Sequence, residues 1–311
     1  MLVLKDLKVE IPGTNTHYFG LEELGEDDGE NILVYGYSNM LDNQLFDQIQ
    51  HYRNKIYLNV IMPTDFCGGH GIEQDDKFDQ VWTICPYSVD WLNKIKNTNK
   101  YKLTNYPFNA EDIPSNTDKL YDVCYHGGLH GEKWVRMLEV MSAFNYSYMT
   151  MTHGINRLTQ ANLSAATDLN LTHWEKLERI SQCKISICFN NTSISSLHVS
   201  RIKSLPSYEE NTAFNFIDHK IIPQIKSRIN EAAFCRTLNL VERDPWNVIE
   251  YWYEPGVDFV YFDNLIDLYH KIIHILNNWS DYVPMIESAF EKSKRYSSQT
   301  LYKRIVEENN E

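Results

Sequence analysis

The chain has 311 residues, 43% of them hydrophobic and 23% charged, which is ordinary for a globular protein and long enough for two domains. Its net charge of −13 disfavours non-specific nucleic-acid binding, which depends on neutralising phosphates. No apolar run approaches the roughly 20 residues of a membrane-spanning helix, and the N-terminus lacks the pattern of a secretory signal. The six cysteines form no CxxC pair, so we expect reduced thiols and a cytoplasmic protein.

The first part of the chain alternates short apolar runs with segments of helical spacing. Expected strands and helices alternate at residues 31–38, 40–53, 55–62, 78–85 and 87–96. Strands separated by helices indicate βαβ units, and therefore a parallel sheet covered on both faces.

Residues 105–120 contain two prolines, several asparagines and no periodicity, so we interpret them as a linker. A second α/β series follows, with expected strands at 121–128, 146–152, 184–190, 237–241 and 258–262. After "DFVYF" comes an amphipathic helix capped by Asp263 or Asn264, and polar helices follow it.

This organisation predicts two Rossmann-like α/β domains with mostly parallel sheets, facing each other across a ligand-binding cleft. We expect residues 1–118 to form the N-terminal domain and residues 119–296 the C-terminal domain. Residues 297–311 would form a C-terminal helix that packs back on the N-terminal domain.

Several polar residues follow the expected strands of the second domain. Gly127 and Gly128 stand between a strand and a helix, where backbone N–H groups favour phosphate; a simple tight turn is the alternative. His153 and Asn190 also follow apolar strands, and in a parallel sheet such residues line the ligand crevice. Local turn formation explains the same residue types equally well.

The segment "KIIPQIKSRINEAAF" has the spacing of a helix that starts near Pro223. Lys226 and Arg228 then flank its apolar stripe, and Glu231 lies one turn beyond Arg228. One interpretation is a solvated helix edge with an intrahelical Arg228–Glu231 pair. The other is a ligand site in which cations bind pyrophosphate and a carboxylate binds ribose hydroxyls.

A glycine-rich loop, "MPTDFCGGHGIEQDD", follows a strand of the first domain. Asp65 and His70 in this loop are candidates for a general base, in that order. One histidine among scattered carboxylates does not have the spacing of zinc ligands, so we expect no metal site. The following stretch, "EQDDKFD", is expected to be a solvated loop.

At this point the chain resembles a known family. The segments "YDVCYHGG", "LERISQCKISICFN", "IKSRINEAAFCRTLNLVERD" and "YEPGVDFVYFDNLIDLYHKIIHIL" follow the order seen in donor domains of GT-B glycosyltransferases. They are most similar to the exostosin-like and spore-maturation-type branches. The resemblance covers about residues 120–296, and its most specific part runs from R-x-x-E to D-F-x-x-F.

The resemblance implies roles for the residues at the strand ends and in the R-x-x-E helix. Arg228, with Lys226, would bind the diphosphate of a nucleotide-sugar donor, and Glu231 its ribose. The residues lining the donor site would be Gly127, Gly128, His153 and Asn190. One departure concerns Pro223, which stands where many retaining members have a second glutamate, so the stereochemistry stays open.

The expected function is therefore transfer of a hexose or pentose from a nucleotide-diphosphate-sugar to a glycan or other hydroxyl acceptor, in glycan or polysaccharide synthesis. Neither a cofactor nor a metal ion is expected, since GT-B enzymes generally need none. The alternative is a two-domain protein that binds a nucleotide or glycan without turnover. A nicotinamide-dependent enzyme is disfavoured, because the glycine-rich fingerprint is missing.

Overall fold

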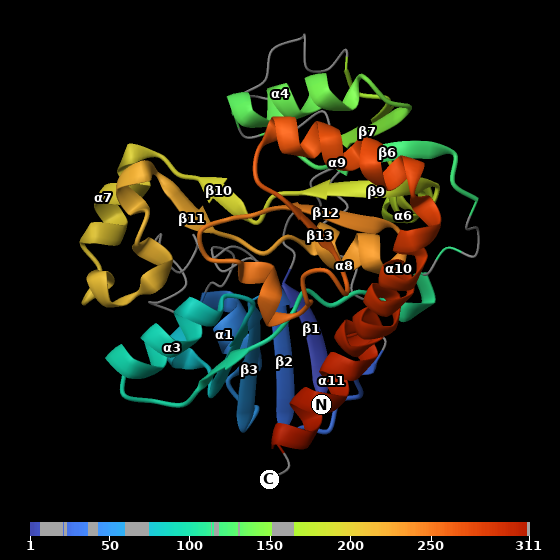
Figure 1. The fold of residues 1–311 in the computed structure, drawn as a ribbon. Coiled ribbons are helices and arrows are strands. Elements are labelled where there is room, and N and C mark those ends of the chain that lie inside the picture. The colour runs from blue at the N-terminus through green and yellow to red at the C-terminus, as the bar shows by residue number, and fades with distance from the viewer. Residues whose placement is uncertain are drawn as a thin grey trace.

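The computed structural model describes residues 1–6, 21, 24–36, 43–59, 75–112, 114, 118–129, 131–150 and 165–309. Each half of the chain forms a parallel β-sheet with helices packed against it (Figure 1). The predicted α/β class with mostly parallel sheets is therefore confirmed. Among the described residues, no helix is both long and apolar enough to cross a membrane.

The N-terminal sheet has, in the described part of the chain, five parallel strands in the order β1-β2-β3-β4-β5. Their bounds are Leu2–Asp6, Asn31–Gly36, Asn54–Asn59, Gln80–Thr83 and Tyr101–Leu103. Helices α1 (Asn43–Ile49) and α3 (Pro86–Ile95) accompany them among the described residues. Strand β1 is absent from the predicted elements, because five residues that mix apolar and charged side chains give no clear period.

The C-terminal sheet has six described parallel strands in the order β13-β12-β9-β6-β7-β8. In chain order their bounds are Tyr121–His126 (β6), Tyr146–Thr150 (β7), Asp168–Leu169 (β8), Cys183–Cys188 (β9), Leu238–Glu242 (β12) and Val260–Phe262 (β13). The chain runs outward from β6 to β8 and then returns to β9 on the other side of β6. The strand order thus reverses between β6 and β9, and in doubly wound sheets ligands bind beyond such a reversal.

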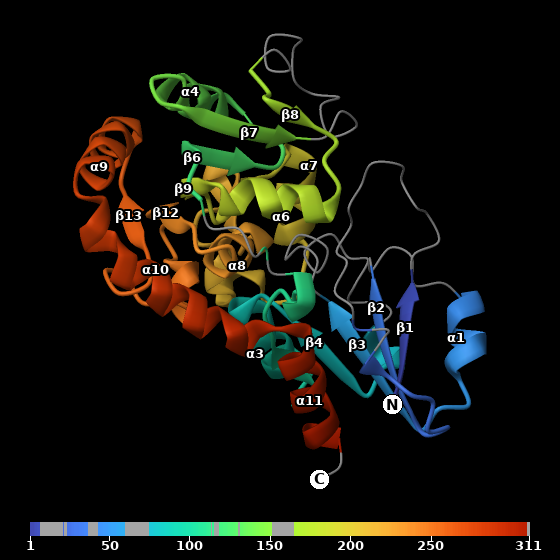
Figure 2. The ribbon, with the colours of Figure 1, turned by 90° about the vertical axis from the view of Figure 1, so that its right-hand side faces the viewer.

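Helices cover both faces of the C-terminal sheet (Figure 2). Successive side chains of β6 point to opposite faces: Tyr125 packs in the core under α4 and α9, and Cys124 packs against α6 and α8. The bounds of these helices are Glu132–Met141 (α4), Leu265–Asn277 (α9), His173–Ser181 (α6) and Ser227–Phe234 (α8). Covering both faces buries the apolar strands that the sequence predicts.

Two of these helices begin at side-chain caps. Thr172 and Glu175 form a reciprocal capping box at the start of α6. The side chain of Asn264 accepts hydrogen bonds from the N–H groups of Ile266 and Asp267 at the start of α9. Of the two predicted caps for α9, Asn264 is therefore the one used.

A small lobe interrupts the C-terminal domain between β9 and α8. Its elements are β10 (Asn191–Ser193), α7 (Ser196–Lys203), three 3-10 turns (Tyr208–Glu210, Thr212–Phe214 and Ile217–His219) and β11 (Ile221–Pro223). Strands β10 and β11 pair antiparallel. The lobe, residues 191–223, has its own buried core of Ile194, Ile202, Ala213, Phe214, Ile217 and Ile222.

The two sheets are joined by a continuous hydrophobic cluster and by polar contacts. Leu58 and Trp82 from the N-terminal sheet share this cluster with Ile229 of α8. Asn230, also in α8, donates a hydrogen bond from Nδ2 to the carbonyl of Tyr106, 3.0 Å away, in the segment that connects the sheets. Helix α8 is thus tied directly to the connection between the domains.

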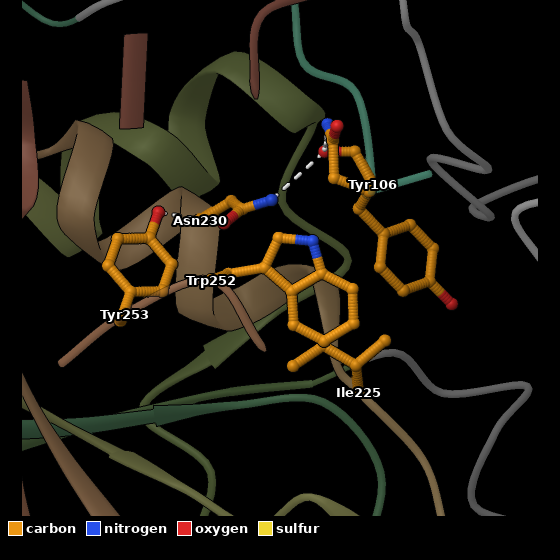
Figure 3. Close-up of a pocket in the computed structure, with 6 residues that line it drawn as sticks. Tyr106, Ile225, Asn230, Trp252 and Tyr253 are labelled. Carbon is orange, nitrogen blue, oxygen red and sulfur yellow. Dashed lines mark hydrogen bonds between the residues drawn. The ribbon is translucent and has the colours of Figure 1, made fainter. Parts of the chain in front are cut away.

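A cavity of about 10 Å³, room for one water molecule, lies beside this contact (Figure 3). The residues that line it are Asn105, Tyr106, Ile225, Asn230, Trp252 and Tyr253. Asn230 bridges the joint, because its Oδ1 also accepts a hydrogen bond of 2.8 Å from the Tyr253 hydroxyl.

The last two helices, α10 (Trp279–Ser293) and α11 (Ser298–Asn309), lead the chain back to the N-terminal sheet (Figure 2). Arg304 of α11 lies over the Trp82 ring, 4.5 Å from its centroid, and donates to the carbonyl of Leu103. The Tyr302 hydroxyl donates to the carbonyl of Met1 at 3.1 Å. The domain boundaries at residues 118 and 296 stay a prediction.

The expectation of a solvated loop around "EQDDKFD" is wrong for Asp75. This carboxylate is buried, is paired with the Lys96 ammonium at 2.7 Å and accepts a hydrogen bond from the Tyr101 hydroxyl. Both partners come from later in the chain, so the local sequence gives no sign of them. Burial raises the pKa of Asp75, and these partners oppose that shift.

The D-F-x-x-F motif has a structural role in this fold. The carboxylate of Asp258, which is buried, accepts hydrogen bonds from the Ser288 hydroxyl at 2.7 Å and from the Glu254 N–H at 2.7 Å, and it pairs with Lys292. Ser288 and Lys292 belong to α10, so Asp258 fixes that helix to the loop before β13.

Replacing Asp258 by alanine should lower the free energy of unfolding by about 2–4 kcal/mol, because three donors lose their acceptor. Urea denaturation followed by circular dichroism measures this change. Asp263→Ala is the matched control: Asp263 forms an exposed pair with Arg243 at 3.0 Å, and such pairs contribute little. Equal midpoints for the two variants would contradict the role given to Asp258.

Candidate functional site

The predicted residues Gly127 and Asn190 lie on either side of the reversal in strand order. Gly127 directly follows β6 and Asn190 lies two residues beyond the end of β9, and these strands are neighbours. Gly127 has φ of +120°, a conformation open to glycine but not to side-chain-bearing residues. Gly128 comes next, and its carbonyl accepts a hydrogen bond from the Tyr125 hydroxyl at 3.0 Å.

Asn190 is fully buried, and its Nδ2 has no hydrogen-bond partner among the described residues. Its backbone carbonyl accepts a hydrogen bond of 2.8 Å from the N–H of Gln224, which places Asn190 beside the chain that enters α8. A buried amide without a partner costs free energy unless a ligand or water satisfies it.

Helix α8 begins later than the sequence predicts. Pro223 is the last residue of β11, and the helix starts at Ser227 with Lys226 as its N-cap residue. A proline is tolerated in so short a strand, because it lies at the edge of a sheet. The side chain of Lys226 does not accept a hydrogen bond from the first N–H groups of α8. These N–H groups carry the positive end of the helix dipole.

Arg228 reaches from the first turn of α8 toward the carboxyl end of β6. Its guanidinium lies 4.6 Å from the centroid of the Tyr125 ring. It also packs on Gly127: a Cβ at that position would lie 2.4 Å from Nη2 of Arg228. Arg228 is 8% exposed, and within the described part of the chain it forms no ion pair with a carboxylate.

The intrahelical Arg228–Glu231 pair, one of the two interpretations of this segment, is wrong. Glu231 pairs instead with two residues from other elements. Its Oε2 lies 2.8 Å from Nε2 of His126 in β6, and its Oε1 lies 2.7 Å from the ammonium of Lys176 in α6. Among the residues that the structure describes, Arg228 is therefore left without an acidic partner.

Glu231 is ionised in this site. Burial opposes ionisation, but the ammonium of Lys176 and then the contact with His126 outweigh it, so the pKa of Glu231 lies well below its ordinary value. His173 lies near the same network, and burial, followed by the charge of Lys176, lowers its pKa to about 4. His173 is therefore neutral at physiological pH, whereas Glu231 is charged.

Lys226 is partly buried and donates to the side-chain oxygen of Gln224. Burial, and next the positive charge of Arg228, lowers the pKa of Lys226 to about 7. A nearby anion would favour the charged form of this ammonium.

Sequence reasoning missed three residues near this site: His126, Lys176 and Lys133. His126 immediately precedes Gly127 in the quoted "YDVCYHGG", so its place at a strand end was a usable signal. Lys133, in the first turn of α4, lies 2.6 Å from Glu242 and 4.8 Å from the centroid of the Phe189 ring. Nothing local distinguishes Lys133 or Lys176 from other helix lysines.

Three predicted site residues, Asp65, His70 and His153, lie outside the described residues. The residues that the structure does describe contain no group of three or more His, Cys, Asp or Glu side chains that could hold a metal ion.

Solved glycosyltransferases share this fold. HepE from Anabaena in complex with UDP-glucose has 11% sequence identity and a TM-score of 0.61, with 90% of this chain and 78% of that chain covered. Sucrose-phosphate synthase from Thermosynechococcus elongatus has 10% identity and a TM-score of 0.58, with 90% and 73% covered. TarM from S. aureus has 12% identity and a TM-score of 0.56; 92% of this chain aligns, but it spans only 57% of TarM.

These neighbours have the GT-B fold, and the predicted GT-B architecture is thereby confirmed. At the sequence level no family model matches the chain, and no curated protein matches it. The finer likeness to exostosin-like and spore-maturation-type branches stays a prediction.

Replacing Gly127 by alanine should lower the free energy of unfolding by about 1–3 kcal/mol, since the new Cβ strains the backbone and collides with Arg228. Chemical denaturation measures the change. Gly256→Ala is the control, because Gly256 also has positive φ (+77°) but faces open space.

The double variant Gly127→Ala/Arg228→Ala separates the two causes of the stability loss, because it keeps the backbone strain and removes the collision with Arg228. If removing Arg228 recovers none of the stability lost in Gly127→Ala, the guanidinium does not pack on Gly127 as described.

Proposed function

We propose that the protein is a glycosyltransferase that moves a sugar from a nucleotide-diphosphate-sugar to a hydroxyl group of a glycan or other acceptor, without a bound metal ion. A role in glycan or polysaccharide synthesis follows from that substrate class. The transferred sugar would be a hexose or a pentose, and the protein would act in the cytoplasm.

The guanidinium of Arg228, which is buried and has no carboxylate partner in the described part of the chain, is the observation that carries this proposal. A buried charge without a partner is costly, and a bound anion removes that cost. Guanidinium groups bind phosphate oxygens in a bidentate manner. Arg228 lies at the carboxyl end of β6, where doubly wound sheets bind their ligands.

The groups around Arg228 suit a diphosphate. The start of α8 presents backbone N–H groups that Lys226 does not cap, and Lys226 adds a second cation. The unpartnered Nδ2 of Asn190 adds a neutral donor. Such donors, fixed before the reaction, would stabilise the charge that develops on the leaving diphosphate.

The carboxylate of Glu231 would accept hydrogen bonds from the ribose of the donor. Its two oxygens each accept from one protein group, His126 or Lys176, and a carboxylate has about four acceptor positions. Acceptor positions therefore remain for ribose hydroxyls. Gly127, Gly128 and His153 complete the proposed donor site, and Asp65, then His70, are our candidates for the base that deprotonates the acceptor.

The structural neighbours support the same substrate class. Structures of HepE hold UDP or UDP-glucose, and a TarM structure holds UDP with fondaparinux and α-GlcNAc-glycerol. By likeness of fold, UDP is the first nucleotide to test on this chain.

A thermal-shift screen with UDP, GDP, ADP, TDP and CMP should find a nucleotide that stabilises the protein. At 100 times its dissociation constant the ligand adds about 2.7 kcal/mol. Arg228→Ala should abolish the shift because it removes the main phosphate ligand. Arg304→Ala is the matched control: this guanidinium also lies over an aromatic ring, that of Trp82, but on the N-terminal sheet, so the shift should persist.

If no nucleotide shifts the melting temperature, the proposal fails. A shift that survives in Arg228→Ala removes Arg228 from the site. Release of sugar from the stabilising donor, measured without acceptor, separates an enzyme from a protein that binds without turnover.

Nucleotide affinity should fall as pH rises between about pH 7 and about pH 9, by up to about tenfold per pH unit. Lys226 has a pKa of about 7 in the free protein, so above that value binding must take up a proton to charge the ammonium. Calorimetric titration in buffers of different ionisation enthalpy measures this uptake. Lys226→Arg keeps a permanent charge and should flatten the profile; an unchanged profile would rule out Lys226 as its source.

A further inference from the structure

The lobe of residues 191–223 stands where other parallel folds have a short loop. The connection from β9 to α8 runs from Phe189 to Lys226, whereas loops from strand to helix in α/β units usually have about two to six residues. It is also folded, with its own core and an antiparallel ribbon. A connection of this length is therefore far longer than the join between β9 and α8 requires.

The base of the lobe is part of the candidate donor site. Its first strand, β10, begins at Asn191, directly after Asn190, and its last strand, β11, ends at Pro223. Between β11 and α8, the N–H of Gln224 bonds to the carbonyl of Asn190 at 2.8 Å. Movement of the ribbon would therefore move both Asn190 and the Lys226 end of α8.

The tip of the lobe lies on α3 of the N-terminal domain (Figure 1). The indole Nε1 of Trp91 in α3 donates to the carbonyl of Ser207 at 3.1 Å. The same ring meets Phe214 of the lobe core edge to face, with centroids 6.0 Å apart. Trp91 is 3% exposed, so both contacts are buried.

Other contacts hold the same surface together. Tyr87 of α3 packs on the lobe core, and its hydroxyl donates to the carbonyl of Trp246 at 3.2 Å. The indole of Trp246 in turn donates to the carbonyl of Thr212 in the lobe at 3.1 Å. Lys94 pairs with Glu210, but both side chains are well exposed, so this pair contributes little.

We propose that the lobe is a strap that transmits the position of the N-terminal domain to the donor site, with Trp91 as its anchoring residue. With Trp91 seated, the β10–β11 ribbon holds Asn190 and the start of α8 in the arrangement that binds the diphosphate. When α3 moves away, the ribbon is released and donor affinity falls. Trp91 is thus a positioning residue, which acts on a ligand that it does not touch, and this role rests on the proposed function.

The test compares two buried tryptophans of the N-terminal sheet and its helices. Trp91→Phe removes the hydrogen bond to the lobe but keeps an aromatic ring in the core. Trp82→Phe is the matched control, since the Trp82 indole is also buried and bonds only to Gln80 among the described residues, at 3.0 Å. Both variants are titrated with UDP by calorimetry, and their backbone amides are followed by hydrogen exchange without nucleotide.

Trp91→Phe should weaken UDP binding by about fivefold or more, and Trp82→Phe should not. In the free protein, Trp91→Phe should also speed exchange at the Gln224 amide, which bonds to Asn190, while leaving amides of β6 unchanged. Equal effects of the two variants, or none from Trp91→Phe, would overturn the strap. If wild-type protein fails to bind UDP or any other nucleotide, the proposed function fails, whereas the exchange result still decides whether Trp91 holds the ribbon.

Discussion

A buried guanidinium with no acidic partner in the ranges that the structure describes is the constraint around which the C-terminal domain is arranged. Arg228 reaches the carboxyl end of β6 because residue 127 is a glycine, and it lies over the ring of Tyr125. The nearest acid in its helix, Glu231, pairs with His126 and Lys176 instead. The described residues around Arg228 therefore leave its positive charge without a paired carboxylate, and an anionic ligand is the physical means of compensating it.

The same helix connects this charge to the rest of the molecule. Asn230, two residues after Arg228, is hydrogen-bonded to the segment that joins the sheets, and the lobe that precedes the helix lies on α3. Helix α8 is therefore held at its start and at its middle by contacts that reach the N-terminal domain. Through the proposed strap, a ligand that favours one position of α8 would also favour one arrangement of the domains.

The sequence predicted the order of the elements well, because apolar periodicity and turn residues are local properties. It also predicted which residues stand at the strand ends, including Gly127 and Asn190. It could not predict the partners of Glu231, which come from elements far away in the chain, or the burial of Asp75, which depends on Lys96 and Tyr101. The start of α8 was misplaced, since Pro223 suits a helix start and an edge strand equally well. Long-range pairing, rather than local preference, decided each of these cases.

The return of α11 to the N-terminal sheet has a consequence for how the protein is made. Arg304 and Tyr302 contact carbonyl groups of β5 and of Met1, which leave the ribosome well before α11 does. The surface of the N-terminal sheet that α11 contacts therefore stays uncovered until α11 itself has been synthesised. During synthesis, domains usually fold one after another from the N-terminus. A domain whose apolar surface stays exposed during this time is prone to aggregate. Truncation within α11 would leave the N-terminal sheet in this incomplete state permanently, although all the residues of the proposed donor site would be present.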